Sequence, residues 1–219
     1  MGCVEPANDT TCPPDALPVH TVELRDFYMG RTEVTQAEWT SWMGTNPSFY
    51  AGAADSPSRP VERVQLPDIG YFNFFTGTRL PTEAEWEYAC RAGTTTAFHS
   101  MPTYPNGFNA DGLVWQIAWL FSNSADQTNP VGLKPANGFG LHDMSGNVRE
   151  WVNDWYSGTY YASSPAVDPQ GPAAGDFGWR VKRGGGWLSF SRWLRSAARQ
   201  GDPPAAAAYE TGLRVVRDP

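Results

Sequence analysis

The most regular pattern of apolar and polar positions in this chain predicts a short helix over residues 36–43. Thr35 is followed three residues later by Glu38, which is the spacing of a capping box, where two side chains satisfy free backbone N–H groups at a helix start. Trp39 and Trp42 are three residues apart, so we expect both on the inner face of this helix.

Two further short helices are predicted upstream of Gly93. Thr82 and Glu85 form a second capping box, and Gly93 can end the helix that follows, which predicts a helix over about 83–91. The segment PDIGYFNFF (67–75) has Pro at a first-turn position ahead of four aromatic residues, which predicts a short buried helix.

Strand patterns are short and scattered. HTVEL at 20–24 alternates as an edge strand does, 114–121 is an apolar strand candidate, and GLRVV at 212–216 predicts a last strand. WRVKR predicts another strand, with Arg180 and Lys182 on one side. These elements predict an α+β fold: a single compact domain, 1–219, with low regular secondary structure.

The composition supports one aromatic-rich domain. Hydrophobic residues make up 41% and charged residues 18% of the chain, which is enough apolar material to bury a core. The 22 Gly and 19 Pro residues disfavour long helices or strands, and no internal repeat or linker divides the chain.

The charge excludes some partners. The formal net charge is −7, whereas a protein that binds nucleic acid needs a basic surface. No apolar run approaches the roughly 18 residues of a membrane span, and no signal peptide is visible. We therefore expect no nucleic-acid partner and no membrane span.

The three cysteines are Cys3, Cys12 and Cys90. The first two lie in an irregular segment, and we expect a disulfide between them that staples an N-terminal loop, 1–18; two free thiols are the alternative. A disulfide predicts an oxidising location: extracellular, periplasmic or at the cell surface. Cys90 follows EWEYA in a predicted helix and is expected to be a small buried residue.

Several segments, taken in order, resemble the formylglycine-generating enzyme family, also called sulfatase-modifying factors. They are RTEVTQAEW, RPVERV, RLPTEAEWEYACRAG, NPVG, NGFGLHDMSGNVREWVNDWY, RVKRGGGW, RSAAR and TGLRVV. The resemblance covers nearly the whole chain and implies a variant of the C-type-lectin fold. It also implies that a first strand of the family's domain precedes Met1.

The motif GNVREW suggests a calcium site. Asn147 offers an amide oxygen and Glu150 a carboxylate three residues later, and oxygen ligands suit Ca²⁺. In the resembling family this motif is a structural calcium site, although Arg149 stands where the family usually has Trp. The alternative is that Asn147 caps a turn and Glu150 pairs with a nearby Arg.

The cysteine pair of the family's oxidases is missing. The family has a Gly-Gly-Ser segment, then a Cys, and a second Cys five residues later; these thiolates suit the soft ion Cu(I). Here Gly184, Gly185 and Gly186 are followed by Ser189 at the first Cys position, while the second falls on Leu194 or is lost. Copper-dependent oxidation of a substrate Cys is therefore expected to be absent.

Other catalytic chemistry has little support in the sequence. A second branch of the family resembles sulfoxide synthases that bind iron through histidines on an added helical domain. Here the only histidines are His20, His99 and His142, with no H-x-x-x-H pair. A triad of Ser189, His142 and Asp143 has no supporting spacing.

The region 186–208 instead predicts a ligand-binding surface, because aromatic and Arg side chains are typical of binding sites. The candidate contact residues are Trp187, Ser189, Phe190, Ser191, Trp193 and Arg195. Trp187 and Trp193 could instead be core residues. Segments 188–194 and 202–210 resemble the place where variable proteins of diversity-generating retroelements display ligand-contacting residues.

Two functions remain open from the sequence. The first is a calcium-stabilised, non-catalytic binding module for an unknown protein or small molecule. The second is an enzyme of the same family with different, cysteine-independent chemistry. Stoichiometric copper or iron would favour the enzyme, and calcium alone the module.

Overall fold

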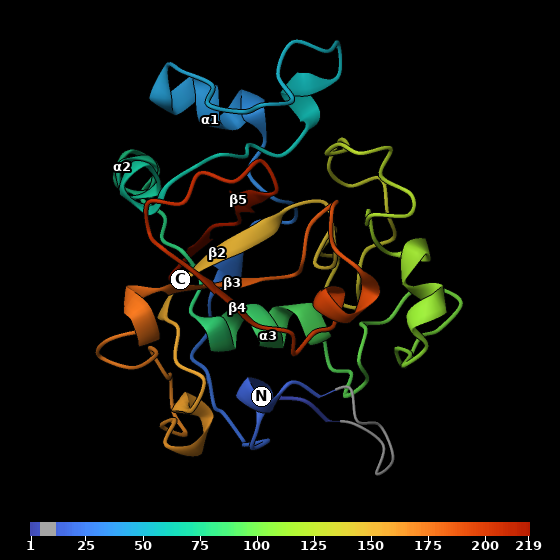
Figure 1. The fold of residues 1–219 in the computed structure, drawn as a ribbon, viewed down its shortest axis with the longest axis vertical. Helices are drawn as coiled ribbons and strands as arrows, with labels where there is room; N and C mark the ends of the chain where they lie inside the picture. The colour runs from blue at the N-terminus through green and yellow to red at the C-terminus, as the bar shows by residue number, and fades with distance from the viewer. Residues whose placement is uncertain (5–11) are drawn as a thin grey trace.

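A four-stranded sheet lies at the centre of the computed structural model, which describes residues 1–4 and 12–219 (Figure 1). Its strands are β2 (Arg149–Trp155), β3 (Arg180–Arg183), β4 (Gln200–Asp202) and β5 (Thr211–Leu213), in the spatial order β4–β3–β2–β5. β2 pairs antiparallel with β3 and parallel with β5, and β3 pairs antiparallel with β4. The chain between β3 and β4 therefore leaves the sheet and returns to it.

A second, two-stranded sheet joins early and late parts of the chain. β1 (Tyr28–Met29) pairs antiparallel with β6 (Val216–Arg217). Gly30 N–H also donates to the carbonyl of Val215 at 2.9 Å, which extends the contact by one residue. This sheet thus joins a segment near the start of the chain to its last residues.

Helices cover both faces of the central sheet (Figure 1). α1 (Gln36–Met43) and α2 (Leu66–Thr76) lie on one side and α3 (Glu83–Arg91) on the other. The other helical segments are single 3₁₀ turns or short 3₁₀ helices: η1 (Pro14–Ala16), η2 (Ser56–Ser58), η3 (Asp111–Gln116), η4 (Tyr160–Ala162), η5 (Asp176–Gly178) and η6 (Ser191–Leu194). The α+β prediction with little regular structure is confirmed.

The predicted capping boxes are both present. In α1 the Thr35 hydroxyl accepts from Glu38 N–H, and the Glu38 carboxylate accepts from Thr35 N–H. Thr82 and Glu85 make the same reciprocal bonds at the start of α3. Both helices have the bounds predicted from the sequence, because the caps fix where each helix begins.

Two predictions about which helix residues face the core are partly wrong: that Trp39 and Trp42 both lie on the inner face of α1, and that α2 is a buried helix. Trp39 is buried, but Trp42 is 54% exposed. In α2 only Phe72 of the four aromatic residues is buried, and Phe74 is 81% exposed. A helix turns about 100° per residue, so closely spaced aromatic residues cannot all face one core.

Two strand predictions are wrong and one is interrupted. The segment 20–24 makes only a single bridge, from Glu23 to Val167. The candidate at 114–121 begins inside the 3₁₀ helix η3. The predicted last strand divides into β5, which pairs with β2, and β6, which pairs with β1, and the side chain of Arg214 between them is fully buried.

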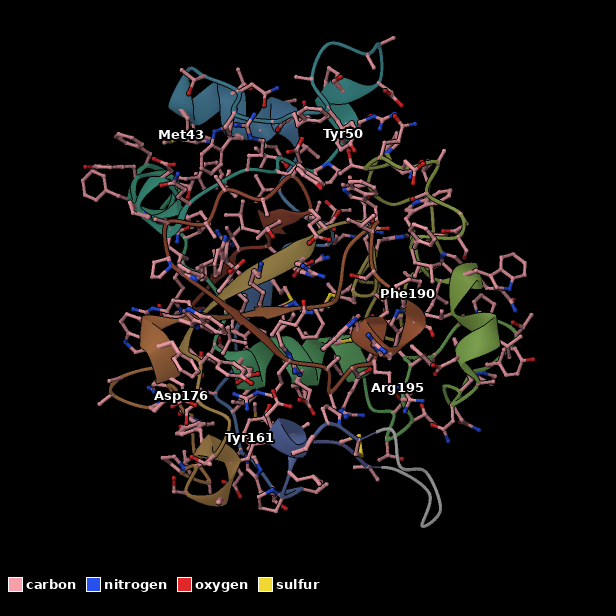
Figure 2. The ribbon with its side chains drawn as sticks, viewed as in Figure 1. Met43, Tyr50, Tyr161, Asp176, Phe190 and Arg195 are labelled. Atoms are coloured by element: carbon pink, nitrogen blue, oxygen red, sulfur yellow. A yellow bond between two sulfur atoms is a disulfide. The ribbon has the colours of Figure 1, made fainter. Side chains whose placement is uncertain are left out.

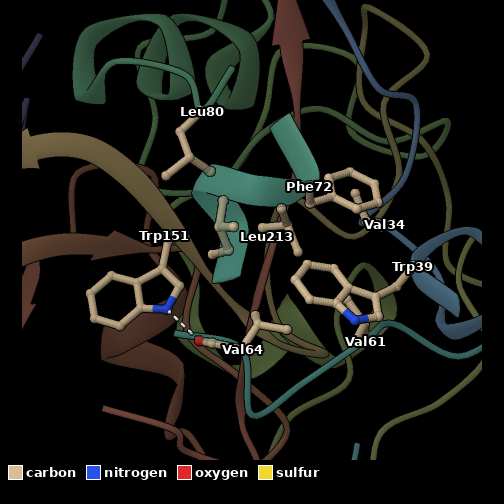
Figure 3. Close-up of a cluster of buried hydrophobic side chains, with 9 residues drawn as sticks. Val34, Trp39, Val61, Val64, Phe72, Leu80, Trp151 and Leu213 are labelled. Carbon is tan, nitrogen blue, oxygen red and sulfur yellow. Dashed lines mark hydrogen bonds between the residues drawn. The ribbon is translucent and has the colours of Figure 1, made fainter. Parts of the chain in front are cut away.

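One apolar cluster packs α1 and α2 onto the sheet (Figure 3). The rings of Trp39 and Phe72 stack with centroids 5.1 Å apart. The Trp151 indole N–H from β2 donates to the Val64 carbonyl at 3.1 Å, so this buried polar atom is satisfied.

Buried ion pairs fasten α3 to the chain that returns from β3. Arg199 Nε donates to Glu83 Oε1 at 2.7 Å, and Arg183 Nη2 donates to Glu87 Oε2 at 2.6 Å. The Arg183 guanidinium also donates to the backbone carbonyls of 196–198 at 2.7 to 3.1 Å. These contacts fix the end of the segment that carries the predicted binding residues.

The predicted disulfide between Cys3 and Cys12 is present, with Cα atoms 5.7 Å apart. It packs against Ala16 and Ala197, so the predicted N-terminal loop contacts the returning segment. Residues 5–11 of that loop lie outside the described residues.

Candidate binding surface

The predicted ligand-binding residues lie in the segment between β3 and β4, whose start depends on glycine. Gly185 has φ +67°, and a Cβ there would lie 2.9 Å from both Leu194 Cδ1 and the Trp193 carbonyl oxygen. A larger residue would collide with the segment's own return path. The glycines therefore allow a tight turn of the backbone just before the candidate residues.

Trp187 lies beneath the predicted binding surface, in the protein interior. Its indole N–H donates to the Tyr209 carbonyl at 3.2 Å, and its ring packs against the rings of Tyr50 and Tyr209 at 5.6 and 5.7 Å. The side chain is buried. The alternative interpretation, that Trp187 is a core residue, is confirmed.

Ser189 is also buried and its hydroxyl is occupied. Its Oγ accepts from Gly186 N–H at 3.0 Å and from Arg149 Nη2 at 3.2 Å. Arg149 in turn forms an ion pair with Glu210. The position that would carry a thiol in the family's oxidases is here a structural hydroxyl.

Ser191 and Arg195 meet at one carboxylate. Ser191 Oγ donates to Asp111 Oδ2 and Arg195 Nη2 donates to Asp111 Oδ1, each at 2.9 Å. Arg195 is buried, with its guanidinium 5.8 Å from the Phe98 ring centre. Trp193 is half-buried against the apolar cluster of 97–120. These residues hold η6 onto η3 rather than reaching outward.

The outward-facing positions of the segment are Leu188, Phe190 and Arg192. Phe190 is 58% exposed and lies at the start of η6, where Figure 2 labels it near Arg195. Its ring packs on the ring of Phe121 with centroids 5.3 Å apart. Of the six predicted contact residues, Phe190 is the one that the structure presents most clearly to solvent.

The predicted calcium ligands are already engaged by protein groups. The Glu150 carboxylate accepts from Arg214 at 2.8 and 3.0 Å and from the Trp86 indole at 2.6 Å. Asn147 Oδ1 accepts from Asn129 N–H at 2.9 Å, and its amide donates to Glu33. The two side chains thus do not fit a calcium ion as first ligands, and the turn-and-ion-pair alternative describes them.

Several buried acidic side chains nevertheless lie close to Asn147 and Glu150. Burial and the nearby charges of Asp143 and Glu150 raise the pKa of Glu33 well above its usual range. Burial also raises the pKa of Asp143, whose Oδ1 has no hydrogen-bond partner among the described residues. Within 1–4 and 12–219, no group of three or more His, Cys, Asp or Glu side chains has the arrangement of a metal site.

The remaining cysteine cannot serve the candidate site. Cys90 is buried in α3, where burial raises the pKa of its thiol to about 11. Its Sγ lies 3.6 Å from Ser196 Oγ and 3.7 Å from the Met144 carbonyl oxygen. A thiol that stays protonated in the core is a poor metal ligand.

Sequence reasoning missed the parts of the surface that come from distant segments. Tyr50, Phe121 and Tyr209 supply rings to it, and Asp111 supplies the carboxylate that ties Ser191 to Arg195. The three aromatic residues lie in turns and Asp111 begins the short 3₁₀ helix η3, so no local pattern could place the four residues together. In the described part of the chain, no helix has the length and apolar character of a membrane span.

Comparison with known proteins gives consistent results over the whole chain. A model described as the sulfatase-modifying factor enzyme 1-like domain matches residues 2–219. The formylglycine-generating enzyme of Streptomyces coelicolor is 33% identical, with 92% of this chain and 81% of that protein covered. The similar solved structures include Treponema denticola variable protein 1 (TM-score 0.83, 28% identity, 100% of this chain and 94% of the other) and PvdO from Pseudomonas aeruginosa (TM-score 0.80, 26% identity, 100% of this chain and 90% of the other).

Proposed function

We propose that this chain, which belongs to the sulfatase-modifying factor family, is a binding module without the cysteine-based oxidation chemistry of the formylglycine-generating enzymes. The observation that carries the proposal is the state of its three cysteines. Cys3 and Cys12 are bonded to each other, and Cys90 is buried in α3. The segment after the glycines offers Ser189 and Leu194 instead.

These two residues cannot replace a thiolate pair. Cu(I) is a soft ion that favours sulfur ligands, whereas Ser189 has a hard oxygen that is already hydrogen-bonded inside the protein. Leu194 has no donor atom and is buried in an apolar cluster. The family's scaffold is kept while the ligands for the reactive metal are missing.

The surface formed by 186–208 is the proposed ligand-binding face. Its support is the exposed aromatic side chain of Phe190 and the fold shared with Treponema denticola variable protein 1. We propose that the chain is a variable ligand-binding protein of a diversity-generating retroelement. A neighbouring reverse-transcriptase gene would support this proposal.

A structural calcium ion is a separate proposal. The buried carboxyl groups of Glu33, Asp143 and Glu150 lie around the single guanidinium of Arg214, and the raised pKa values of Glu33 and Asp143 reflect the cost of ionising all three without a further cation. The unpartnered Oδ1 of Asp143 supports a cation beside this group, with Asp143 rather than Asn147 or Glu150 as the available side-chain ligand.

An oxidising location is proposed from the Cys3–Cys12 disulfide, because such bonds persist mainly outside reducing compartments. Extracellular, periplasmic and cell-surface sites all satisfy this condition.

A turnover assay tests the absence of oxidation chemistry. The protein, supplied with copper and oxygen, is incubated with a Cys-containing sulfatase peptide, and formylglycine is measured by mass spectrometry. The Streptomyces coelicolor enzyme is the positive control. We expect no product from this chain, and none from Ser189→Cys, because one thiolate does not make a pair. Product formation by the unmodified protein would overturn the proposal, and stoichiometric copper or iron would favour the enzymatic alternative.

A further inference from the structure

We infer that a polar hollow beside β4, at the edge of the central sheet, binds a neutral saccharide. The inference rests on the proposed binding function and names the class of ligand for one part of the segment 186–208. The size of the hollow, the pairing of its charges and its polar groups without partners all favour this class of ligand.

The hollow is about 590 Å³ in volume, within the range of about 300–1,000 Å³ that is usual for small-molecule sites. All three residues of β4 line it, and β4 is an edge strand of the sheet. Pro13 and Pro14 of the N-terminal loop line it as well. Tyr156 and Trp193 supply aromatic rings, and the partly negative face of such a ring can hold the C–H groups of a sugar.

The cations that line the hollow are already paired with carboxylates. The pairs among the described residues are Lys182–Asp202, Arg149–Glu210 and Arg199–Glu83. A phosphate or another anion therefore finds no unpaired cation here. A cationic ligand would lie beside cations that repel it. The charges of the hollow thus favour a ligand without net charge.

Several other polar groups of the hollow have no partner among the described residues. The side-chain amide of Gln200 makes no hydrogen bond to any of them. The Asp202 carboxylate uses one oxygen for Lys182 and has the other free. Asp15 uses one oxygen for the Tyr156 hydroxyl, at 2.7 Å, and also has the other free. Gln200 and Asp202 are two residues apart on β4, so they point to the same face of the sheet.

These free groups match the hydroxyl groups of a sugar. The amide of Gln200 can both donate and accept, and the carboxylate oxygens of Asp15 and Asp202 can accept from hydroxyls. An apolar ligand would cover the same groups without replacing their hydrogen bonds to water, which costs free energy. An extended peptide is a poorer match, because β4 has only three residues and so offers few backbone groups for pairing with an added strand.

The test is a glycan array with neutral and acidic saccharides, probed with the folded protein, and a linear peptide array is a parallel arm. We expect binding to neutral saccharides. The best-bound saccharide is then titrated in free form by calorimetry, and Gln200→Ala should weaken its binding about fivefold or more, because one hydrogen bond to the ligand is lost. The melting temperature of this variant should be unchanged, since the Gln200 side chain has no partner among the described residues.

Gln127→Ala is the matched control, because Gln127 is a half-buried side chain of the same type that does not line this hollow. It should leave saccharide binding unchanged. No binding to neutral saccharides, or equal affinities of Gln200→Ala and the unmodified protein, would overturn the inference. Binding to peptides alone would also overturn it while leaving the binding-module proposal intact, and turnover in the oxidation assay would remove that proposal instead.

Discussion

At the scale of single residues, the interior depends on carboxylates that each have a fixed partner. Glu150 lies between the Arg214 guanidinium and the Trp86 indole, and all three side chains are fully buried. Removing one member of a buried ion pair leaves an uncompensated charge in the core. Glu150 is therefore expected to be a stability residue whether or not a metal ion is nearby.

Glu150→Gln should lower the free energy of unfolding by roughly 3–5 kcal/mol, because Arg214 loses its charged partner. Urea denaturation with and without EDTA measures this loss, and we expect it in both conditions. In a separate thermal denaturation experiment, chelation should lower the melting temperature of the calcium-loaded unmodified protein but not of Asp143→Asn. An unmodified protein that shows no response to EDTA would count against the proposed ion, and a stable Glu150→Gln variant against the ion-pair account.

The candidate site shows at this same scale what a sequence can reveal. The replacement of a Cys by Ser189 can be read directly from the motif, because it concerns residue identity. The burial of Trp187, Ser189 and Arg195 cannot be read in this way, because it depends on Tyr209, Arg149 and Asp111, which are brought there only by the fold.

At the scale of elements, helix starts were predictable, whereas of the strands only β3 was predicted close to its observed bounds, from WRVKR. The capping boxes at Thr35 and Thr82 are local signals, so the bounds of α1 and α3 follow from a few adjacent residues. β2 was missed, because its residues REWVNDW are buried on both faces at several positions and do not alternate simply. Short strands take their conformation from their neighbours in the sheet, which a local pattern does not contain.

The two caps should differ in their contribution to stability. Thr35→Ala and Thr82→Ala each remove a side-chain acceptor from a helix N-terminus, which typically costs about 1 kcal/mol. The loss should be larger at Thr82, because that cap is buried and the exposed backbone donors at Thr35 can bind water instead. Chemical denaturation of both variants measures the difference, with Thr82→Ser as the control that keeps the hydroxyl. Equal losses would show that burial of the cap does not matter.

At the scale of the whole molecule, buried acids link stability to pH. Burial and the neighbouring charge of Glu83 raise the pKa of Asp154 to about 8. In the unfolded chain this carboxyl ionises near its usual value of about 4. The folded state therefore holds a proton that the unfolded state releases, and stability falls as pH rises through the window from about 4 to about 8. Burial also raises the pKa values of Glu33, Glu62 and Asp143, which act in the same direction.

Asp154→Asn should reduce this dependence on pH. The amide cannot ionise, and its oxygen can still accept the hydrogen bond from Glu83 N–H that Asp154 accepts at 2.8 Å. Melting temperatures measured between about pH 5 and 8 should fall less steeply in the variant than in the unmodified protein. Parallel curves for the two proteins would show that Asp154 stays ionised in the folded state.

The way in which Arg183 holds the returning segment has a consequence for engineering. Its guanidinium binds backbone carbonyls of 196–198, and backbone carbonyls are present whatever side chains the segment carries. Leu188, Phe190 and Arg192 are exposed and take no part in these contacts. The stretch is therefore a replaceable cassette, in which randomised residues at these three positions can be screened for new specificities while the frame around them keeps its shape.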